Sequence, residues 1–233
     1  MTYSSNLSIK AENIAKAYTK NNHETVDVLK NLNFEINSGQ SAAIVGHSGC
    51  GKSTFLQILG TLLKPNSGQV LIGNEAIFTK KDRELSSFRN KNIGFVFQFH
   101  HLLPDFTATE NVAIPLLMQK MDVQKALKKA EAALKEVHLL DRKDHKPSAM
   151  SGGEQQRTAI ARALVTQPKI VLADEPTGNL DEETGASVGQ LLFEHVKQHH
   201  CALVVVTHNR NLAKSADRVL RLSNGCLIPE NMD

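Results

Sequence analysis

Short apolar runs and stretches of helical periodicity alternate along this chain. Residues 7–9 and 28–36 alternate apolar with polar side chains, which predicts two strands, and residues 37–39 supply a turn after the second. Residues 42–45 are a third apolar run, and it enters a glycine-rich loop. Five apolar residues then recur at helical spacing: Phe55, Leu56, Leu59, Leu62 and Leu63. This spacing predicts a helix that ends before the turn at residues 65–68.

The middle of the chain, residues 101–166, is predicted to be mainly helical. One helix has a clear apolar face made of Leu127, Ala130, Leu134 and Val137. Farther on, residues 170–173 and 203–206 are short and apolar throughout, as in strands that are buried on both faces. Residues 187–196 between them have helical periodicity. Strands that alternate with helices predict a mostly parallel α/β sheet.

We expect a single domain, because 233 residues can bury one large core or one core with a smaller inserted lobe. Residues 1–97 and 167–233 would form the core lobe with the sheet. Residues 98–166 would form the inserted helical lobe. The sequence has no internal repeat or linker that indicates a second domain.

The formal net charge is only +3, and basic residues are interleaved with acidic ones. This pattern argues against a nucleic-acid-binding protein, which usually concentrates Lys and Arg on one face. No secretory signal is visible at residues 1–10, and the apolar run at residues 202–206 is far shorter than the ~20 residues that cross a bilayer. Attachment to a membrane would therefore need a partner.

Cysteine and histidine spacing predicts a reducing compartment and no metal site. The cysteines are Cys50, Cys201 and Cys226, which form no CxxC pair. Two histidine pairs, at residues 100–101 and 199–200, are adjacent in sequence. Neighbouring residues on a strand point to opposite faces, so such pairs make poor joint ligands.

The glycine-rich loop fits the phosphate-binding pattern GxxxxGK[ST] and lies between a predicted strand and a predicted helix. Its residues are Gly46, His47, Ser48, Gly49, Cys50, Gly51, Lys52, Ser53 and Thr54. Glycine lets the loop curl so that successive backbone N–H groups meet phosphate oxygens, and the helix N-terminus adds favourable dipoles. Lys52 is expected at the β- and γ-phosphates, Ser53 on Mg²⁺, and Thr54 near the α-phosphate.

Asp174 and Glu175 follow the apolar run at residues 170–173. At the mouth of a parallel sheet beside the phosphate loop, Asp174 can hold Mg²⁺ through water, and Glu175 can polarise the attacking water. Taken alone, the segment could equally be an ordinary turn that leaves a strand. Its place after a phosphate loop favours the catalytic interpretation.

Residues 150–157, with the sequence MSGGEQQR, combine a helix start with two glycines. Ser151 and Glu154 predict a capping box. Gly152 and Gly153 lie in the first turn, where each weakens a helix by ~1 kcal/mol relative to alanine. We therefore expect that this helix start approaches a phosphate closely.

This segment resembles the signature motif of ABC transporter ATPases, usually written LSGGQ, and other motifs of that family follow the same order from about residue 7 to 225. Tyr18 occupies the position of the ring that stacks on adenine. Gln98 is similar to the Q-loop glutamine that binds Mg²⁺ and senses the membrane partner. Asp181 lies in a segment similar to the D-loop, and His208 resembles the switch histidine at the γ-phosphate.

The resemblance implies an α/β P-loop NTPase fold of the RecA-like type, with a mostly parallel sheet, an antiparallel β lobe and an inserted α-helical subdomain. It also implies an ATP hydrolase that uses ATP and Mg²⁺. Two copies would pair head to tail as a homodimer, so that Ser151, Gly152 and Gly153 of one copy hold the ATP bound by the other.

The stretch at residues 98–112 and the sequence ADEPTGNLD at residues 173–181 resemble the ATPases of lipoprotein-releasing transporters. The second stretch is shared with macrolide-export and cell-division ATPases, which remain the alternative. The resemblance implies two integral membrane subunits, LolC/LolE-like, and a peripheral position on the cytoplasmic face of an inner membrane. No nucleic acid would be bound, and the membrane would be contacted only through these partners.

Two other classes fit less well. ABC proteins of DNA repair carry long coiled-coil insertions and those of translation carry two ATPase domains per chain, and the sequence shows neither. A P-loop kinase would leave the SGGEQ segment and His208 without a role. Two residues depart from the family pattern: Cys50 replaces the usual serine, and Asn209 follows His208 where aspartate is common.

Overall fold

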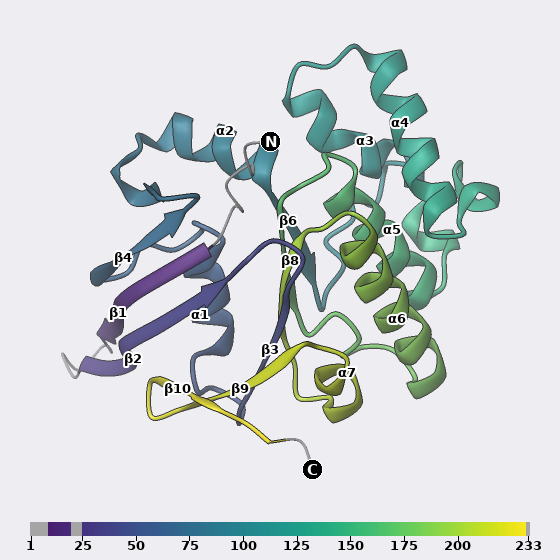
Figure 1. Ribbon diagram of the computed structural model, residues 1–233. Coiled ribbons are helices and arrows are strands. Elements are labelled where there is room, and N and C mark those ends of the chain that lie inside the picture. Colours follow the sequence, from purple (N-terminus) through teal and green to yellow (C-terminus); the bar gives the residue numbers. More distant parts are fainter. Residues whose placement is uncertain (1–8, 20–24, 232–233) are drawn as a thin grey trace, which may run out of the picture.

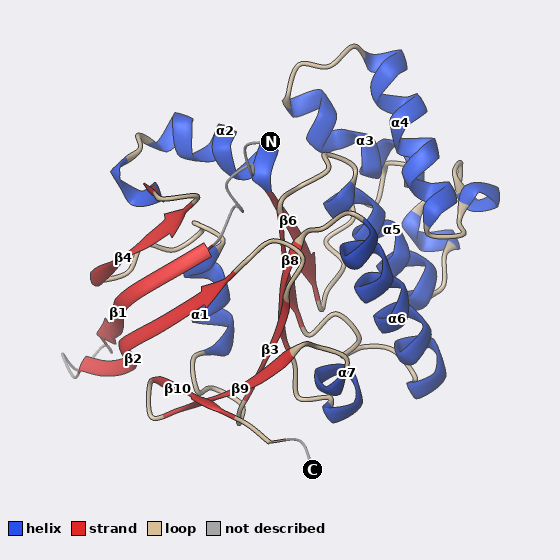
Figure 2. Cartoon of the chain, viewed as in Figure 1, coloured by secondary structure: helices blue, strands red, loops and turns tan. Residues whose placement is uncertain are grey.

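The computed structural model describes residues 9–19 and 25–231. Two sheets and a group of helices make up this part of the chain (Figures 1 and 2). The strands are β1 (Ile9–Thr19), β2 (Thr25–Ile36), β3 (Ser41–Val45), β4 (Ser67–Ile72), β5 (Glu75–Ala76), β6 (Ile93–Phe97), β7 (Ile170–Asp174), β8 (Ala202–Val206), β9 (Arg218–Ser223) and β10 (Cys226–Pro229). The helices are α1 (Lys52–Leu59), α2 (Asp82–Asn92), α3 (Ala108–Met118), α4 (Val123–Glu136), α5 (Gly152–Leu164), α6 (Glu182–Gln198) and α7 (Arg210–Lys214).

The larger sheet has the strand order β10-β9-β3-β8-β7-β6 and is parallel except for the β9–β10 hairpin. Its central strands are buried on both faces, as the apolar runs predict. In β7, Ile170 and Leu172 pack on one side of the sheet, whereas Val171 and Ala173 pack on the other. Successive residues of a strand point to opposite faces, so each strand contributes to two cores.

One core fills the space between the larger sheet, helix α1 and the second sheet. The second sheet is antiparallel, in the order β2-β1-β4-β5. Its inward residues, such as Ile14 and Leu32, meet Phe55 and Ile58 of α1. The antiparallel sheet therefore covers the same face of the parallel sheet as α1, as Figure 1 shows on its left side.

The other core joins helices α3, α4, α5 and α6 to the opposite face of the parallel sheet. These helices lie on the right side of Figure 1. Ala126, Ala130 and Leu134 of α4 are fully buried, which confirms the helix predicted from its apolar face. Two further short turns of 3₁₀ helix, at Leu140–Arg142 and Pro147–Ala149, connect α4 to α5.

Several element boundaries differ from the sequence prediction, including the start of β2 at Thr25 and not at residue 28. Helix α1 ends at Leu59 rather than near residue 63, because Gly60 caps it and the following residues turn away. Helix α6 begins at Glu182, five residues before the predicted start, because Asp181 caps it. Residues 7 and 8 of the first predicted strand lie outside the described residues, and β1 continues to Thr19.

Helices α2 and α7 and strands β4, β5, β6, β9 and β10 were not predicted from the apolar pattern. Helix α2 has no buried residue, so it lacks the apolar face on which such a prediction depends. Among residues 9–19 and 25–231, no helix is both long and apolar enough to span a membrane.

Candidate active site

Four loops meet at the carboxyl edge of the parallel sheet. They follow β3, β8, β7 and β6, which are neighbours in the sheet. Because parallel strands point the same way, the segments that leave their carboxyl ends lie side by side. These loops border a cavity of about 840 Å³. The residues that line it are Tyr18, Val28, Gly46, Ser48, Gly49, Gly51, Lys52, Ser53, Thr54, Gln57, Phe97, Gln98, Phe99, His101, Asp174, Glu175 and His208.

The loop between β3 and α1 has the backbone that its glycines allow. Gly49 and Gly51 have φ angles of 77° and 106°, which side-chain-bearing residues rarely adopt. A Cβ atom on Gly51 would also lie 2.6 Å from Cγ1 of Val28. The Nζ atom of Lys52 donates to the carbonyl oxygens of Gly46 and His47, at 3.0 and 3.1 Å. The loop thus curls around the ammonium group.

Helix α1 starts directly after this loop and has no side-chain cap. Its first N–H groups and its dipole therefore face the cavity, an arrangement that favours an anion. Two residues of the motif do not line the cavity. His47 is exposed, with its Nδ1 atom 2.9 Å from the carbonyl oxygen of Ser48. Cys50 is half-buried and packs against the core beneath the loop.

Asp174 is the last residue of β7 and lies beside the start of α1. The hydroxyl of Ser53 donates to Oδ1 of Asp174 at 3.1 Å. Burial raises the pKa of the Asp174 carboxyl; the Ser53 hydrogen bond opposes this shift, and the nearby Glu175 carboxylate adds to it. The charged form of Asp174 is therefore destabilised in the nucleotide-free protein. A divalent cation beside Ser53 and Asp174 would relieve that cost.

Glu175 has a φ angle of 47°, which is unusual for a residue with a side chain. Its backbone N–H donates to the carbonyl oxygen of Val206 at 2.8 Å, so the turn is anchored on the neighbouring strand. Its carboxylate contacts His208 twice. Oε1 lies 2.9 Å from Nδ1 of the ring, and Oε2 accepts from the His208 backbone N–H at 3.2 Å.

Gln98 follows β6 and is held by Asn179, a residue for which the sequence predicted no separate role. Nε2 of Gln98 donates to Oδ1 of Asn179 at 2.9 Å, and Nδ2 of Asn179 donates to the Gln98 carbonyl oxygen at 3.0 Å. The amide pair connects the loop after β6 with the loop after β7. The two residues are 81 positions apart, so no local sequence signal could have paired them.

Tyr18 lies at the rim of the cavity, at the end of β1. Its side chain is 43% exposed, and its hydroxyl lies 3.5 Å from Oγ1 of Thr54. The Nζ atom of Lys16 is 5.5 Å from the centre of the ring. The partly exposed ring thus lies close to α1, and stacking on adenine stays a prediction.

Ser151, Gly152 and Gly153 lie at the start of α5 and, like Asp181, are not part of the described cavity lining. The predicted capping box is confirmed: Oγ of Ser151 accepts from the Glu154 backbone at 3.3 Å, and Oε2 of Glu154 accepts from the Ser151 backbone at 2.8 Å. Ser151 and Gly152 are exposed. The Ser151 hydroxyl accepts this bond and keeps its own proton for another acceptor.

The two signature glycines have different structural surroundings. A Cβ atom on Gly153 would lie 2.5 Å from Cγ2 of Thr184 in α6 of the same chain, so Gly153 is needed for helix contact. A Cβ atom on Gly152 would meet only Leu180, at 3.4 Å. Packing against Thr184 is thus one reason for glycine at this position. The expected contact of Gly153 with a phosphate, which would use its backbone N–H, stays a prediction.

Asp181 caps helix α6: its Oδ1 atom accepts from the Thr184 backbone N–H at 2.9 Å. This hydrogen bond holds the pKa of the Asp181 carboxyl below its ordinary value. Asp181 is exposed, and its neighbours Leu180 and Thr184 lie close to Gly152 and Gly153. The loop at residue 181 is therefore near the start of α5.

The fold and the four loops define an ATP-binding cassette. Residues 29–178 match the family model described as ABC transporter, and the chain belongs to that family. Among solved structures, the chain is similar to the ATP-binding cassette MJ0796, seen as a dimer in a post-hydrolysis state bound to ADP and Pi. That similarity has a TM-score of 0.88 and 41% identity, and covers 97% of this chain and 99% of the other.

Two similar relatives carry the same name, which states a function. The lipoprotein-releasing system ATP-binding protein LolD of Syntrophus aciditrophicus (strain SB) is 49% identical over 220 residues, covering 94% of this chain and 98% of that protein. The protein of the same name from Geobacter metallireducens is 52% identical over 205 residues, covering 88% of this chain and 91% of its own.

Proposed function

We propose that this chain is the ATP-binding and ATP-hydrolysing subunit of a transporter that releases lipoproteins from an inner membrane. The observation that carries the ATPase assignment is the cavity at the carboxyl edge of the sheet. There a phosphate-type loop, an Asp–Glu pair and a histidine converge. The names of the relatives, together with high identity over nearly the whole length, support lipoprotein release as the work that is driven.

In this proposal the chain binds ATP together with Mg²⁺. Backbone N–H groups of the loop at residues 46–51 and Lys52 hold the phosphates, and Tyr18 stacks on the adenine. Ser53, Asp174 and Gln98 would hold the cation, which would neutralise negative charge on the phosphates. Their donor atoms are oxygens, as Mg²⁺ prefers. Ser53 and Asp174 already lie within hydrogen-bond distance of one another.

Glu175 acts on the attacking water, and His208 holds Glu175 and contacts the γ-phosphate. Two contacts from one residue fix the carboxylate in orientation. A base that is already positioned pays less entropy when the water arrives. Gln98 is hydrogen-bonded to Asn179. Binding or loss of the cation at Gln98 would therefore change the position of the loop that follows β6.

The catalytic pocket is completed by a second copy. Ser151 and Gly152 are exposed at the start of an α-helix, yet they lie outside the cavity of their own chain. An anion at such a helix start gains ~0.3–2 kcal/mol. A head-to-tail homodimer would place this helix start, and Asp181 beside it, against the nucleotide of the partner. The dimeric state of the similar cassette is consistent with this arrangement.

We also propose that the chain divides into two lobes, a sheet-containing core at residues 1–97 and 167–233 and a helical lobe at residues 98–166. The border falls at Gln98, between β6 and α3. The phosphate loop would lie on one lobe and the signature segment on the other. ATP bound between two copies would then connect the core lobe of one copy with the helical lobe of the other.

We propose that the membrane subunits contact the surface next to Gln98, where the two lobes meet. Phe99 is 66% exposed, and Leu103 and Phe106 follow it on the same loop. A groove of about 390 Å³ lies next to it, lined in part by Leu62, Pro115 and Met118, of which Met118 is 71% exposed. Exposed apolar patches of this kind mark interaction sites. The occupant that we propose is a cytoplasmic segment of an integral membrane subunit, which would hold the chain at the cytoplasmic face.

The decisive test is purification of the intact complex from native membranes through a tag on this chain, followed by reconstitution into vesicles that contain a lipid-anchored substrate protein. ATP-dependent release of the lipoprotein into the soluble fraction is expected, and Glu175→Gln should abolish it. Recovery of a macrolide-export or cell-division partner, with no release of lipoprotein, would overturn the cargo assignment. It would leave the ATPase assignment standing.

A further inference from the structure

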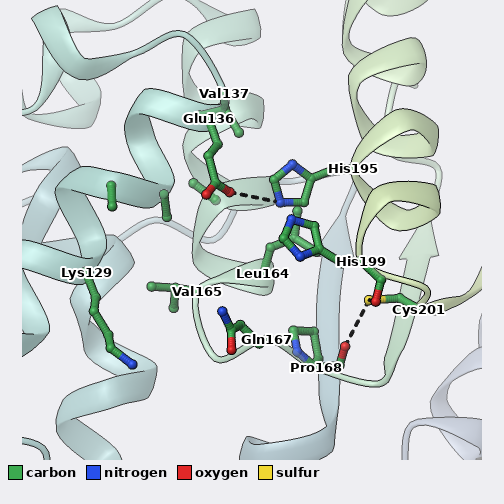
Figure 3. A pocket seen from close by; sticks show the side chains of 13 residues that line it. Lys129, Glu136, Val137, Leu164, Val165, Gln167, Pro168, His195, His199 and Cys201 are labelled. Carbon is green, nitrogen blue, oxygen red and sulfur yellow. Dashed lines mark hydrogen bonds and ion pairs between the residues drawn. The ribbon is translucent and has the colours of Figure 1, made fainter.

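A second cluster of chemically active side chains lies far from the ATP cavity in the described chain, where α4 ends against α6. Glu136 is the last residue of α4, His195 lies in the last turn of α6, and His199 is the residue that caps α6. Figure 3 shows the three side chains turned toward one another across the gap between the helices. The Oε2 atom of Glu136 lies 3.1 Å from Nε2 of His195.

The two histidines are four positions apart on one helix, so they share a face, unlike the adjacent pair at residues 199–200. Their rings stack with centres 4.5 Å apart and an angle of 30° between the planes. One possible ligand atom from each of the three residues lies within 4.8 Å of the other two. Ligands about 2.0–2.1 Å from a tetrahedral metal are separated by about 3.3 Å. The three atoms would therefore have to come closer together, and the stacked rings would have to turn, for all three residues to bind one ion.

One carboxylate lies beside the two imidazoles, one of which is buried. His195 is only 8% exposed, whereas the Glu136 side chain is 51% exposed. A neutral ring with a free nitrogen is the form that binds metals. When Nε2 of His195 takes a metal, its proton has to reside on Nδ1 instead.

A cavity of about 140 Å³ adjoins the three residues. It is bordered by apolar side chains such as Val137 and Val165, and it is large enough for water molecules. Lys129 also lines this cavity, but Figure 3 shows it extending away from the three side chains. The cavity thus provides room for a water molecule as a further ligand.

We propose that Glu136, His195 and His199 bind one divalent transition-metal ion, with Zn²⁺ as the fitting metal and a water molecule from the adjoining cavity as its fourth ligand. Two imidazoles with one carboxylate are a donor set that suits zinc, whereas Mg²⁺ and Ca²⁺ prefer oxygen donors. The ion fastens the end of α4 to the end of α6. It is separate from the cation that serves ATP.

Cys201 lines the same cavity but lies outside the ligand set. Its Sγ atom donates to the carbonyl oxygen of Pro168 at 3.0 Å, as Figure 3 shows. Burial raises the pKa of this thiol to about 11, so the thiolate that a metal requires is disfavoured. Cys201→Ser is therefore expected to leave metal binding unchanged.

The test uses the full-length chain without a histidine tag, freed of metal by a chelator and kept in excess Mg²⁺ so that Mg²⁺ competes with Zn²⁺ for the oxygen donors Ser53 and Asp174. Calorimetric titration with Zn²⁺ should show one site per chain. Co²⁺ as a spectroscopic substitute should give the intense visible absorption of a four-coordinate ion. At free Zn²⁺ near one hundred times Kd, the melting temperature should rise by about 5–10 °C.

The matched variants are His199→Gln and His200→Gln, because both residues are exposed and adjacent. His199→Gln should weaken Zn²⁺ binding at least tenfold and remove both the thermal shift and the cobalt spectrum, and Glu136→Gln should do the same. His200→Gln should bind like the unaltered chain. Absence of a stoichiometric site in the unaltered chain, or equal Zn²⁺ affinity in His199→Gln, would overturn the proposal.

Discussion

The ring of His208 lies with Nδ1 2.9 Å from Oε1 of Glu175, and the backbone N–H of His208 reaches the second carboxylate oxygen at 3.2 Å. The two residues leave neighbouring parallel strands, β8 and β7. Both oxygens of the carboxylate are therefore held from one side. Its remaining lone pairs are available on the side of the cavity, where a water molecule would be activated.

Glu175→Gln tests this arrangement. The amide keeps the size of the side chain but cannot accept a proton, so kcat for ATP hydrolysis should fall by about 10²–10⁴-fold. ATP affinity should be unchanged, and size-exclusion chromatography with MgATP should show a trapped dimer. Glu194→Gln, an exposed acid on α6, is the control and should hydrolyse ATP normally. Normal turnover in Glu175→Gln would contradict the role of this carboxylate.

Ser151→Ala should separate the capping role of this serine from a role in dimerisation. Loss of the cap alone costs about 0.5–2 kcal/mol of stability. Thr107→Ala is a matched control, since Thr107 and Glu110 form the same capping box at the start of α3. Both variants should lose similar stability in thermal unfolding, but only Ser151→Ala should fail to dimerise with MgATP. If both variants dimerised equally, the start of α5 would not be part of the shared site.

Asp174→Asn should stabilise the nucleotide-free chain at neutral pH. Because burial raises the pKa of Asp174, the folded state binds this proton more tightly than the unfolded state does. Stability then decreases as pH rises from the ordinary carboxyl pKa through the raised one. The asparagine variant lacks this penalty, so its advantage in melting temperature should be present at neutral pH and disappear below about pH 4.

With Mg²⁺ and ATP added, the unaltered chain should melt at a higher temperature than Asp174→Asn, because the cation favours the charged carboxylate. Ser53→Ala is the companion variant. It removes the hydrogen bond that lowers the pKa of Asp174, so it should melt below the unaltered chain at neutral pH. A nucleotide-free Asp174→Asn that melts at the unaltered temperature would show that ionised Asp174 carries no cost.

Arg162→Lys should loosen the segment that follows Gln98. The guanidinium of Arg162 on α5 donates to the carbonyl oxygens of His101 and His100, at 2.6 and 2.7 Å. Lysine keeps the charge but cannot form this fork. Stability should fall by about 1–3 kcal/mol, and amide hydrogen exchange should accelerate at residues 99–106. Arg83→Lys, on the exposed face of α2, should change neither measurement.

Local chemistry in the sequence was enough to identify several parts of this protein. The phosphate loop could be predicted because its backbone shape requires glycine at fixed positions, and Gly49 and Gly51 do have positive φ. The capping box at Ser151 could be predicted because its two hydrogen bonds join residues only three apart. The buried strands β7 and β8 followed from apolar runs that suit a sheet covered on both faces.

Other features depend on contacts between residues that are distant in the chain. Helix α2 has no buried residue of its own, and the strands of the β9–β10 hairpin are too short for their apolar residues to show a clear pattern. The pairing of Gln98 with Asn179 and the close approach of Gly153 to Thr184 both require two segments to meet in space. Likewise, Glu136 reaches His195 only because α4 ends against α6.

The sequence by itself determined the chemistry of the loops, since glycine torsion angles, helix caps and short apolar strands are set by near neighbours. Only the tertiary structure decided how those loops combine. The order β3-β8-β7-β6 brings the phosphate loop, His208, Glu175 and Gln98 to one edge, while the start of α5 remains outside. Strand order depends on how the whole sheet is buried between two cores, so it cannot be predicted from any short stretch of sequence.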